Sequence, residues 1–231
     1  MKILLISGHG AGDPGAVATV NGKAYKEADE ARRLTAALAK QLKSVASVAT
    51  YPTERNAYTD YKNGCLKNTA KFNHYNYVLE IHFNAFKADT GDGKTKGVEC
   101  YVTTTEKGIS VEEAICKKIA AVGFTNRGVK RNNWAVIKTA KNAGVSAALL
   151  EVCFIDDADD MKVYEANRAK IACAIAEGII EGFGLKKKSD PLAAAKNTIK
   201  EKAGLSDATI KYLADYEYGD DLLKKLAAAM K

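Results

Sequence analysis

Short apolar runs bounded by glycine, asparagine, aspartate or lysine recur along the first two thirds of the chain, which is the pattern of buried β-strands. Six runs have this character: Lys2–Ser7, Val45–Tyr51, Tyr77–Phe83, Val98–Thr103, Trp134–Ile137 and Ala147–Phe154. We therefore predict six strands in this part of the chain.

Apolar residues between several of these runs recur at intervals of three and four, which is the spacing of one helical face. The two series are Ala31, Leu34, Leu38, Leu42 and Val45, then Ile115, Ile119 and Val122. A third helix is expected from about residue 159 to residue 183. Strands that alternate with helices predict an α/β fold, in which a mainly parallel twisted sheet carries helices on both faces.

The charged stretch 186–190 interrupts this alternation, and Pro191 after it can open a new helix because its missing N–H is not needed in the first turn. We expect a first domain over 1–185, a linker over 186–190 and a small all-α module over 191–231. Its three expected helices are Leu192–Ala203, Ser206–Asp215 and Asp220–Met230. Because so few residues rarely build an independent core, the module is a candidate for docking or for dimerisation.

The composition is that of an ordinary globular chain: 231 residues, 47% hydrophobic and 27% charged. It excludes disordered, collagen-like and disulfide-scaffold classes. Five cysteines without a CxxC pair indicate neither a disulfide framework nor a thiolate zinc site. Apolar runs such as Ala147–Ile155 are far shorter than the roughly 18–20 residues of a membrane span, and the N-terminus lacks a secretory signal. We therefore expect synthesis in the cytoplasm.

The formal net charge of +7 favours encounter with a polyanion such as nucleic acid, an acidic lipid surface or a bacterial wall polymer. However, lysine and arginine are not clustered among aromatic residues, as they are in nucleic-acid grooves. No nucleic-acid partner is expected.

A glycine-rich segment after the first predicted strand contains G-x-G-x-x-G at Gly10, Gly12 and Gly15. A dinucleotide site needs a helix that opens directly at these glycines, but Pro14 and the Asn21-Gly22 pair delay the helix to about Tyr25. The segment is therefore better interpreted as a turn that lets the backbone pass close to the sheet edge.

Two of the three histidines lie where an α/β sheet places its ligands, outside the carboxyl ends of strands. His9 follows the first predicted strand and His82 ends the third, while Glu27 stands in the first turn of the first helix. Glu151 is a charge within an apolar run, so it needs a partner or an exposed strand end. Two imidazoles and one carboxylate are typical of catalytic zinc, and such a site also needs a carboxylate as general base. The simpler alternative is a set of ordinary polar groups, and His74 is interpreted in that way.

At these residues the chain resembles the zinc-dependent N-acetylmuramoyl-L-alanine amidases of the Amidase_3 type, which include bacterial autolysins and phage endolysins. The similar motifs lie in family order over roughly residues 1–184: GHG with Asp13, Gly15 and Ala16; Glu27; Ile81-His82-Phe83-Asn84-Ala85; Asn126-Arg127-Gly128-Val129-Lys130 before Trp134–Ile137; and Leu150-Glu151 with Phe154-Ile155.

The resemblance implies one Zn²⁺ per chain with His9, Glu27 and His82 as ligands and Glu151 as the catalytic residue. Nitrogen and oxygen donors favour zinc over other divalent metals. Glu80 stands where many members have serine, so it is a candidate acceptor that orients His82 or a competing ligand.

Asn84 and Arg127 are candidate substrate contacts, with helix capping or plain surface polarity as the alternative.

The implied reaction is hydrolysis of the amide between N-acetylmuramic acid and L-alanine in peptidoglycan. The resemblance further suggests a phage or prophage endolysin that acts on the wall after release, with residues 191–231 as a wall-binding or dimerisation element. Two alternatives stay open: a zinc carboxypeptidase-like exopeptidase, and a non-catalytic wall-binding protein with structural zinc.

Overall fold

The computed structural model describes residues 1–186 and 191–230. Contacts within the chain divide it into two compact units, one from Met1 to Lys186 and one made up of the helices that follow Pro191. The expected linker, apart from Lys186, lies outside the described residues. No helix among the described residues is both long and apolar enough to cross a membrane.

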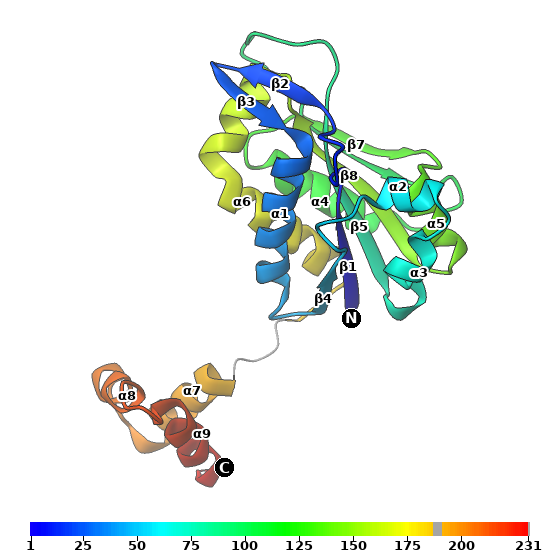
Figure 1. Ribbon diagram of the computed structural model, residues 1–231. Coiled ribbons are helices and arrows are strands. Elements are labelled where there is room, and N and C mark those ends of the chain that lie inside the picture. Colours follow the sequence, from blue (N-terminus) through cyan, green and yellow to red (C-terminus); the bar gives the residue numbers. More distant parts are fainter. Residues whose placement is uncertain (187–190, 231) are drawn as a thin grey trace. The chain divides into compact units, whose positions relative to one another are not determined.

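The first unit is built on a six-stranded sheet in the order β4-β1-β5-β8-β6-β7 (Figure 1). All neighbouring strands run parallel except β6, which is antiparallel to β8. The mainly parallel sheet is thereby confirmed. The strands are β1 (Lys2–Ser7), β4 (Ser47–Thr50), β5 (Tyr77–Asn84), β6 (Val98–Val102), β7 (Asn126–Arg131) and β8 (Ser146–Phe154).

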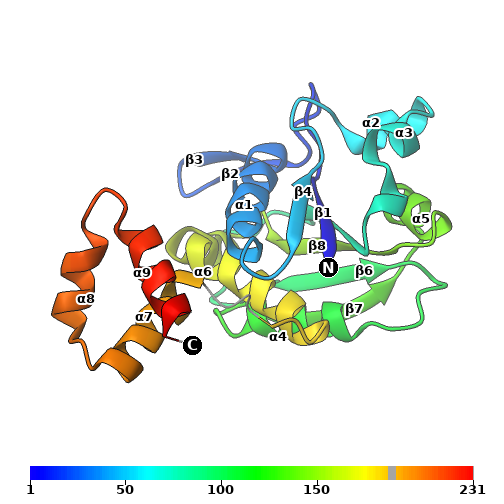
Figure 2. The same cartoon turned by 90° about the horizontal axis from the view of Figure 1, so that it is seen from below.

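Helices cover both faces of this sheet, as expected (Figure 2). Since both faces are buried, the central strands are mainly apolar, and Ile3–Ile6 of β1 are all buried. The first face carries α1 (Glu27–Leu42), α4 (Ser110–Ala120) and α6 (Ala158–Gly182). The second carries α2 (Ala57–Lys62), α3 (Leu66–Ala70), a short 3-10 helix (Phe72–His74) and α5 (Ala135–Asn142).

The strand predicted at Trp134–Ile137 is wrong, because the chain is helical there from Ala135 onward. Val136, Ile137 and Ala140 share the buried side of α5, a helical spacing that the short run concealed. Within the six-stranded sheet the missed strand is β7, which lies at the sheet edge and has the sequence Asn-Arg-Gly-Val-Lys-Arg; the two short hairpin strands β2 (Val17–Val20) and β3 (Lys23–Lys26) were not predicted either. An edge strand with so many polar residues lacks the apolar pattern by which strands are recognised.

A β-hairpin directly precedes α1 in the chain. It consists of β2 (Val17–Val20) and β3 (Lys23–Lys26), joined by Asn21 and Gly22 with φ of 51° and 76°. Asn-Gly with positive φ at both positions is the preferred two-residue hairpin turn. The helix expected from about Tyr25 consequently begins at Glu27.

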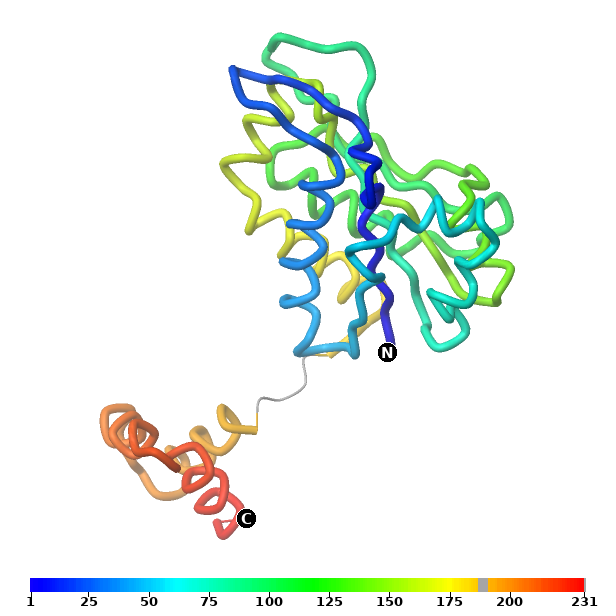
Figure 3. Tube along the Cα trace, viewed as in Figure 1, coloured from blue at the N-terminus to red at the C-terminus, as the bar shows by residue number. Residues whose placement is uncertain are grey.

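The second unit contains three helices, α7 (Pro191–Ala203), α8 (Asp207–Ala214) and α9 (Gly219–Ala229), as the sequence predicts (Figure 3). Ser206 caps α8, since its side chain accepts a hydrogen bond from the backbone N–H of Thr209. The helices share a small core of Ala195, Ile199, Ile210, Leu223 and Ala227. These side chains give the unit an apolar centre of its own.

Candidate metal centre and active site

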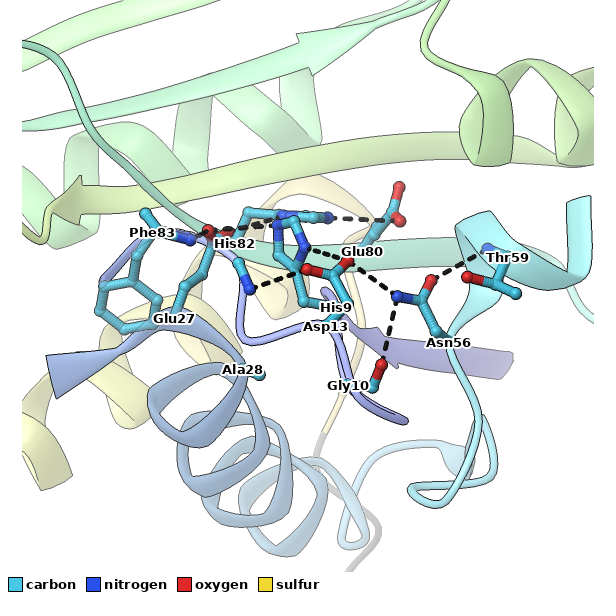
Figure 4. Close-up of polar contacts among 12 residues, drawn as sticks. His9, Gly10, Asp13, Glu27, Ala28, Asn56, Thr59, Glu80, His82 and Phe83 are labelled. Atoms are coloured by element: carbon cyan, nitrogen blue, oxygen red, sulfur yellow. Dashed lines mark hydrogen bonds and ion pairs between the residues drawn. The ribbon is translucent and has the colours of Figure 1, made fainter. Parts of the chain in front are cut away.

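The carboxyl ends of β1 and β5 place His9 and His82 side by side (Figure 4). The ring centroids are 5.0 Å apart and the rings meet edge to face. His9 itself has φ of 59°, in the left-handed region that most residues avoid. A tight turn closed by paired backbone bonds between Gly10 and Asp13 follows it. The loop conformation therefore aims His9 at its partner.

Glu27 lies between the two imidazoles because the loop before the hairpin is tied to the first turn of α1. The backbone N–H groups of Glu27 and Ala28 donate to the carbonyls of Ala16 and Pro14, at 2.9 and 3.0 Å. These bonds satisfy two donors that a helix start leaves free. The side chain of Glu27 is thus fixed where β1, β5 and α1 meet.

The carboxylate of Glu27 contacts both histidines, with Oε2 at 3.1 Å from His9 Nε2 and Oε1 at 2.8 Å from His82 Nδ1. One donor atom from each of the three residues lies within 4.8 Å of the others. Ligands at about 2.1 Å from a tetrahedral zinc are separated by roughly 3.4 Å, so these contacts need only a small adjustment to accept the ion. The donor set fits a catalytic zinc site.

Each histidine also has an acid behind it. His9 Nδ1 is 2.9 Å from Asp13 Oδ2, and that oxygen accepts a further bond of 3.0 Å from the amide of Asn56. His82 Nε2 lies 3.3 Å from Glu80 Oε1, but it has no well-aligned hydrogen bond with any described residue. Acids in these positions orient a ligating imidazole. Glu80 faces the ring nitrogen of His82 that points away from Glu27.

The loop passes so close to His9 and Glu27 at residue 15 that only glycine fits there. The φ of Gly15 is 66°, and a Cβ there would lie 2.6 Å from His9 Cδ2 and 2.7 Å from Glu27 Oε2. A larger residue would push the side chains of His9 and Glu27 apart.

Glu151 comes next in the sheet, since the β5–β8 register pairs it with His82. Its Oε2 atom is buried and has no hydrogen-bond partner among the described residues. A buried carboxylate oxygen without a partner is costly and calls for a functional explanation. Glu151 therefore stands beside the metal donors with an oxygen uncommitted.

Glu99 of β6 follows in the same row, paired with Glu151 in the β6–β8 register. Its Oε1 accepts from Asn84 Nδ2 at 3.0 Å and Tyr101 Oη at 2.8 Å. Its Oε2 accepts from Arg127 Nε and Lys130 Nζ, both at 2.5 Å. The two residues expected to contact substrate thus both bind Glu99.

The three carboxylates differ in pKa. Burial raises the pKa of Glu27, but its bonds to His82 and His9 outweigh that effect and leave it well below the usual range. Burial likewise acts on Glu99, where the bonds from Lys130 and Arg127 leave the pKa lowered. At Glu151 burial dominates and raises the pKa to about 7. Glu27 and Glu99 are therefore ionised at neutral pH, whereas Glu151 exchanges its proton near neutrality.

An apolar cavity of about 210 Å³ opens beside His82 on the second face of the sheet. Tyr58, Trp134 and Glu80 are among the residues that line it. His74 is exposed in the 3-10 helix, as the sequence suggested, and is not among the site residues.

Sequence reasoning gave no role to Asn56, Glu99, Tyr101 or Trp134. The one available signal was Glu99, a charge inside an apolar strand like Glu151.

A His-Glu-His donor set at the carboxyl edge of a mainly parallel sheet, with a half-buried glutamate beside it, is the arrangement of a metal-dependent hydrolase. The comparison with known families specifies the class. The chain belongs to the Amidase_3 family of N-acetylmuramoyl-L-alanine amidases, which it matches over residues 3–181.

Solved structures have the same fold. The catalytic domain of CwlV, an N-acetylmuramoyl-L-alanine amidase from Bacillus (Paenibacillus) polymyxa var. colistinus, is 25% identical with a TM-score of 0.61, covering 80% of this chain and 100% of that one. The catalytic domain of the CD27L endolysin, which targets Clostridia difficile, is 23% identical with a TM-score of 0.60, covering 78% and 97%.

A curated relative, an uncharacterised protein of Clostridium perfringens, is 28% identical over 184 residues, which are 78% of this chain. The chain covers 52% of that relative's length.

We predict that Asp13→Asn weakens zinc binding about 10–100-fold, because an amide no longer offers His9 Nδ1 the same charged acceptor. The measurement is competition with a zinc chelator. Asp29→Asn is the matched control, since Asp29 is an exposed acid in the same turn of α1 as Glu27. Equal zinc affinity in the two variants would refute a role for Asp13.

Proposed function

We propose that this protein hydrolyses the amide between N-acetylmuramic acid and L-alanine, with one Zn²⁺ held by His9, Glu27 and His82 and with Glu151 as the proton-transferring residue. The observation that carries the proposal is the convergence of the three donors next to a buried carboxylate oxygen without a partner. Family membership supplies the substrate class.

The side chains around the centre would hold the ligands in the required form. A bound Zn²⁺ supplies Lewis acidity, which lowers the pKa of water and polarises a carbonyl. With Asp13 at His9 Nδ1, the proton stays on that nitrogen and the lone pair of Nε2 is free to ligate. Glu80 would do the same for His82, because it faces Nε2 and leaves Nδ1 toward Glu27. Its position favours an orienting role over ligation.

Glu151 would move the proton. Because Glu151 is paired with His82 in the sheet, its carboxylate lies next to the candidate zinc ligands. No described residue forms a hydrogen bond with its Oε2 atom. The carboxylate takes a proton from the attacking water as the oxygen bonds to the carbonyl carbon. It then gives the proton to the nitrogen as the C–N bond breaks, so that the products are a muramic carboxylate and a free amine on L-alanine.

We predict that Glu151→Gln lowers kcat by about 10²–10⁴-fold while zinc content and fold are retained, since the amide cannot accept the proton. The assay is release of soluble muropeptides from purified walls. Glu113→Gln, an exposed position on α4, serves as the control. Activity of Glu151→Gln within a few-fold of the wild type would contradict the proposal.

The products of the wild-type protein decide between the proposed reaction and its alternatives. A new amino group on L-alanine indicates the amidase. Release of single amino acids from the peptide end would instead indicate an exopeptidase, and wall adsorption without any new end group would indicate a binding protein.

We also propose that the protein acts as an endolysin of phage or prophage origin, with α7–α9 as a wall-binding unit. Support comes from exposed aromatic side chains on this unit: Tyr212, Tyr216 and Tyr218 are 63%, 55% and 72% exposed. The rings of Tyr212 and Tyr216 meet edge to face at 5.3 Å, and their hydroxyls are 2.7 Å apart. Clustered aromatic rings in solvent are typical of a binding surface.

The occupant that we favour is the glycan strand of peptidoglycan. Tyrosine offers an apolar face with a polar tip, which matches the C–H faces and hydroxyls of a sugar ring. Together with the charged stretch before it, the unit spans residues 186–231, which carry ten lysines and seven acids, and this excess favours approach to an anionic wall.

We predict that Tyr212→Ser with Tyr218→Ser in the full chain weakens wall adsorption at least 10-fold in a sedimentation assay. The matched double variant with phenylalanine keeps the rings and is expected to adsorb like the wild type. Unchanged adsorption of the serine variant would contradict the proposal. A change from dimer to monomer in that variant would instead identify the surface as a dimer interface.

A further inference from the structure

We infer that Arg127 and Lys130 bind a carboxylate on the peptide that leaves in the reaction, so that the peptide lies over β6 and β7. This inference rests on the proposed function, because it uses the direction in which Glu151 delivers its proton.

A single row of side chains crosses the sheet from the metal donors toward β7. The registers pair His82 of β5 with Glu151 of β8, and Glu151 with Glu99 of β6. Parallel or antiparallel neighbours lie about 4.8 Å apart, so Glu99 stands two strand spacings from His82. The next strand, β7, carries the two cations that bind Glu99.

The cations outnumber the acid that they contact. Glu99 is almost fully buried and carries one negative charge, while both Arg127 and Lys130 contact its Oε2 atom. Glu151, the next carboxylate in the row, forms no ion pair with either cation in the described part of the chain. One positive charge is therefore left over at this end of the row.

Arg127 is held in a fixed orientation with donors to spare. Nε is used by Glu99, the guanidinium lies 5.0 Å from the ring of Phe154, and Nη2 has no acceptor among the described residues. The side chains of Arg127 and Lys130 are 37% and 38% exposed. A guanidinium fixed in this way recognises a carboxylate with little further loss of entropy.

The chemistry of the substrate indicates that the carboxylate bound by Arg127 and Lys130 belongs to the peptide and not to the sugar. The carboxyl group of muramic acid is consumed in the scissile amide, so free carboxylates occur only on the peptide. The amine that Glu151 protonates must face Glu151, and the peptide that continues from this amine reaches β6 and β7 next. Phosphates of wall polymers share the same anionic chemistry, and soluble substrates without such polymers separate the two sources.

The test compares N-acetylmuramoyl-L-alanyl-D-glutamate with the same compound in which both carboxylates are amides. For the zinc-loaded wild type, we expect kcat/KM to be at least 10-fold higher for the free acid. In Arg127→Gln, where Lys130 still neutralises Glu99, the preference should fall to about 3-fold or less, mainly through KM. Lys40→Gln removes the same charge from an exposed position on α1 and should keep the wild-type preference.

Binding of the product L-alanyl-D-glutamate and of its diamide, measured by calorimetry, gives a readout that needs no turnover. Tighter binding of the acid that is lost in Arg127→Gln and kept in Lys40→Gln would support the inference. Equal binding and equal cleavage of the acid and the diamide by the wild type would overturn it. Cleavage of neither compound, with acid-selective binding intact, would count against the proposed reaction and not against the carboxylate site.

Discussion

The carboxylate of Glu27 between two imidazoles is the interaction on which the rest of the site depends. A buried charge is tolerated only when it is paired, and here His9, His82 and two backbone N–H groups surround it. Those partners come from β5 and from the loop after β1, while Glu27 itself opens α1. The donor set thus exists only when the central sheet and the first helix are assembled.

The other charged residues of the site lie on neighbouring strands of the same sheet. Because β8 lies next to β5, Glu151 is placed beside the metal donors, and β6 and β7 carry the charge pattern onward through Glu99 to Arg127. Neighbouring side chains on one face of a sheet are held at fixed spacing, which suits groups that must act together. The backbone hydrogen bonds of the sheet therefore fix the positions of His82, Glu151 and Arg127 relative to one another.

Much of this could be predicted from the sequence, because parallel strands leave strong apolar runs and because histidines are few. His9 and His82 stood out at strand ends and Glu27 at the start of a helix, whereas Glu151 stood out as a charge within an apolar run. Asn56 could not be foreseen, since it lies 43 residues after the Asp13 that it contacts and an isolated asparagine carries no pattern. Polar β7 was missed for a similar reason, and with it the relation of Lys130 to Glu99.

The most direct test of the central claim is the zinc content of the wild type, His82→Ala and His74→Ala after dialysis against zinc. His74 is an exposed histidine away from the candidate centre and provides the control. The account predicts one zinc per chain in the wild type and in His74→Ala, with loss of zinc and of wall lysis in His82→Ala. A wild type that lyses walls without metal, or a His82→Ala protein that keeps its zinc, would contradict it.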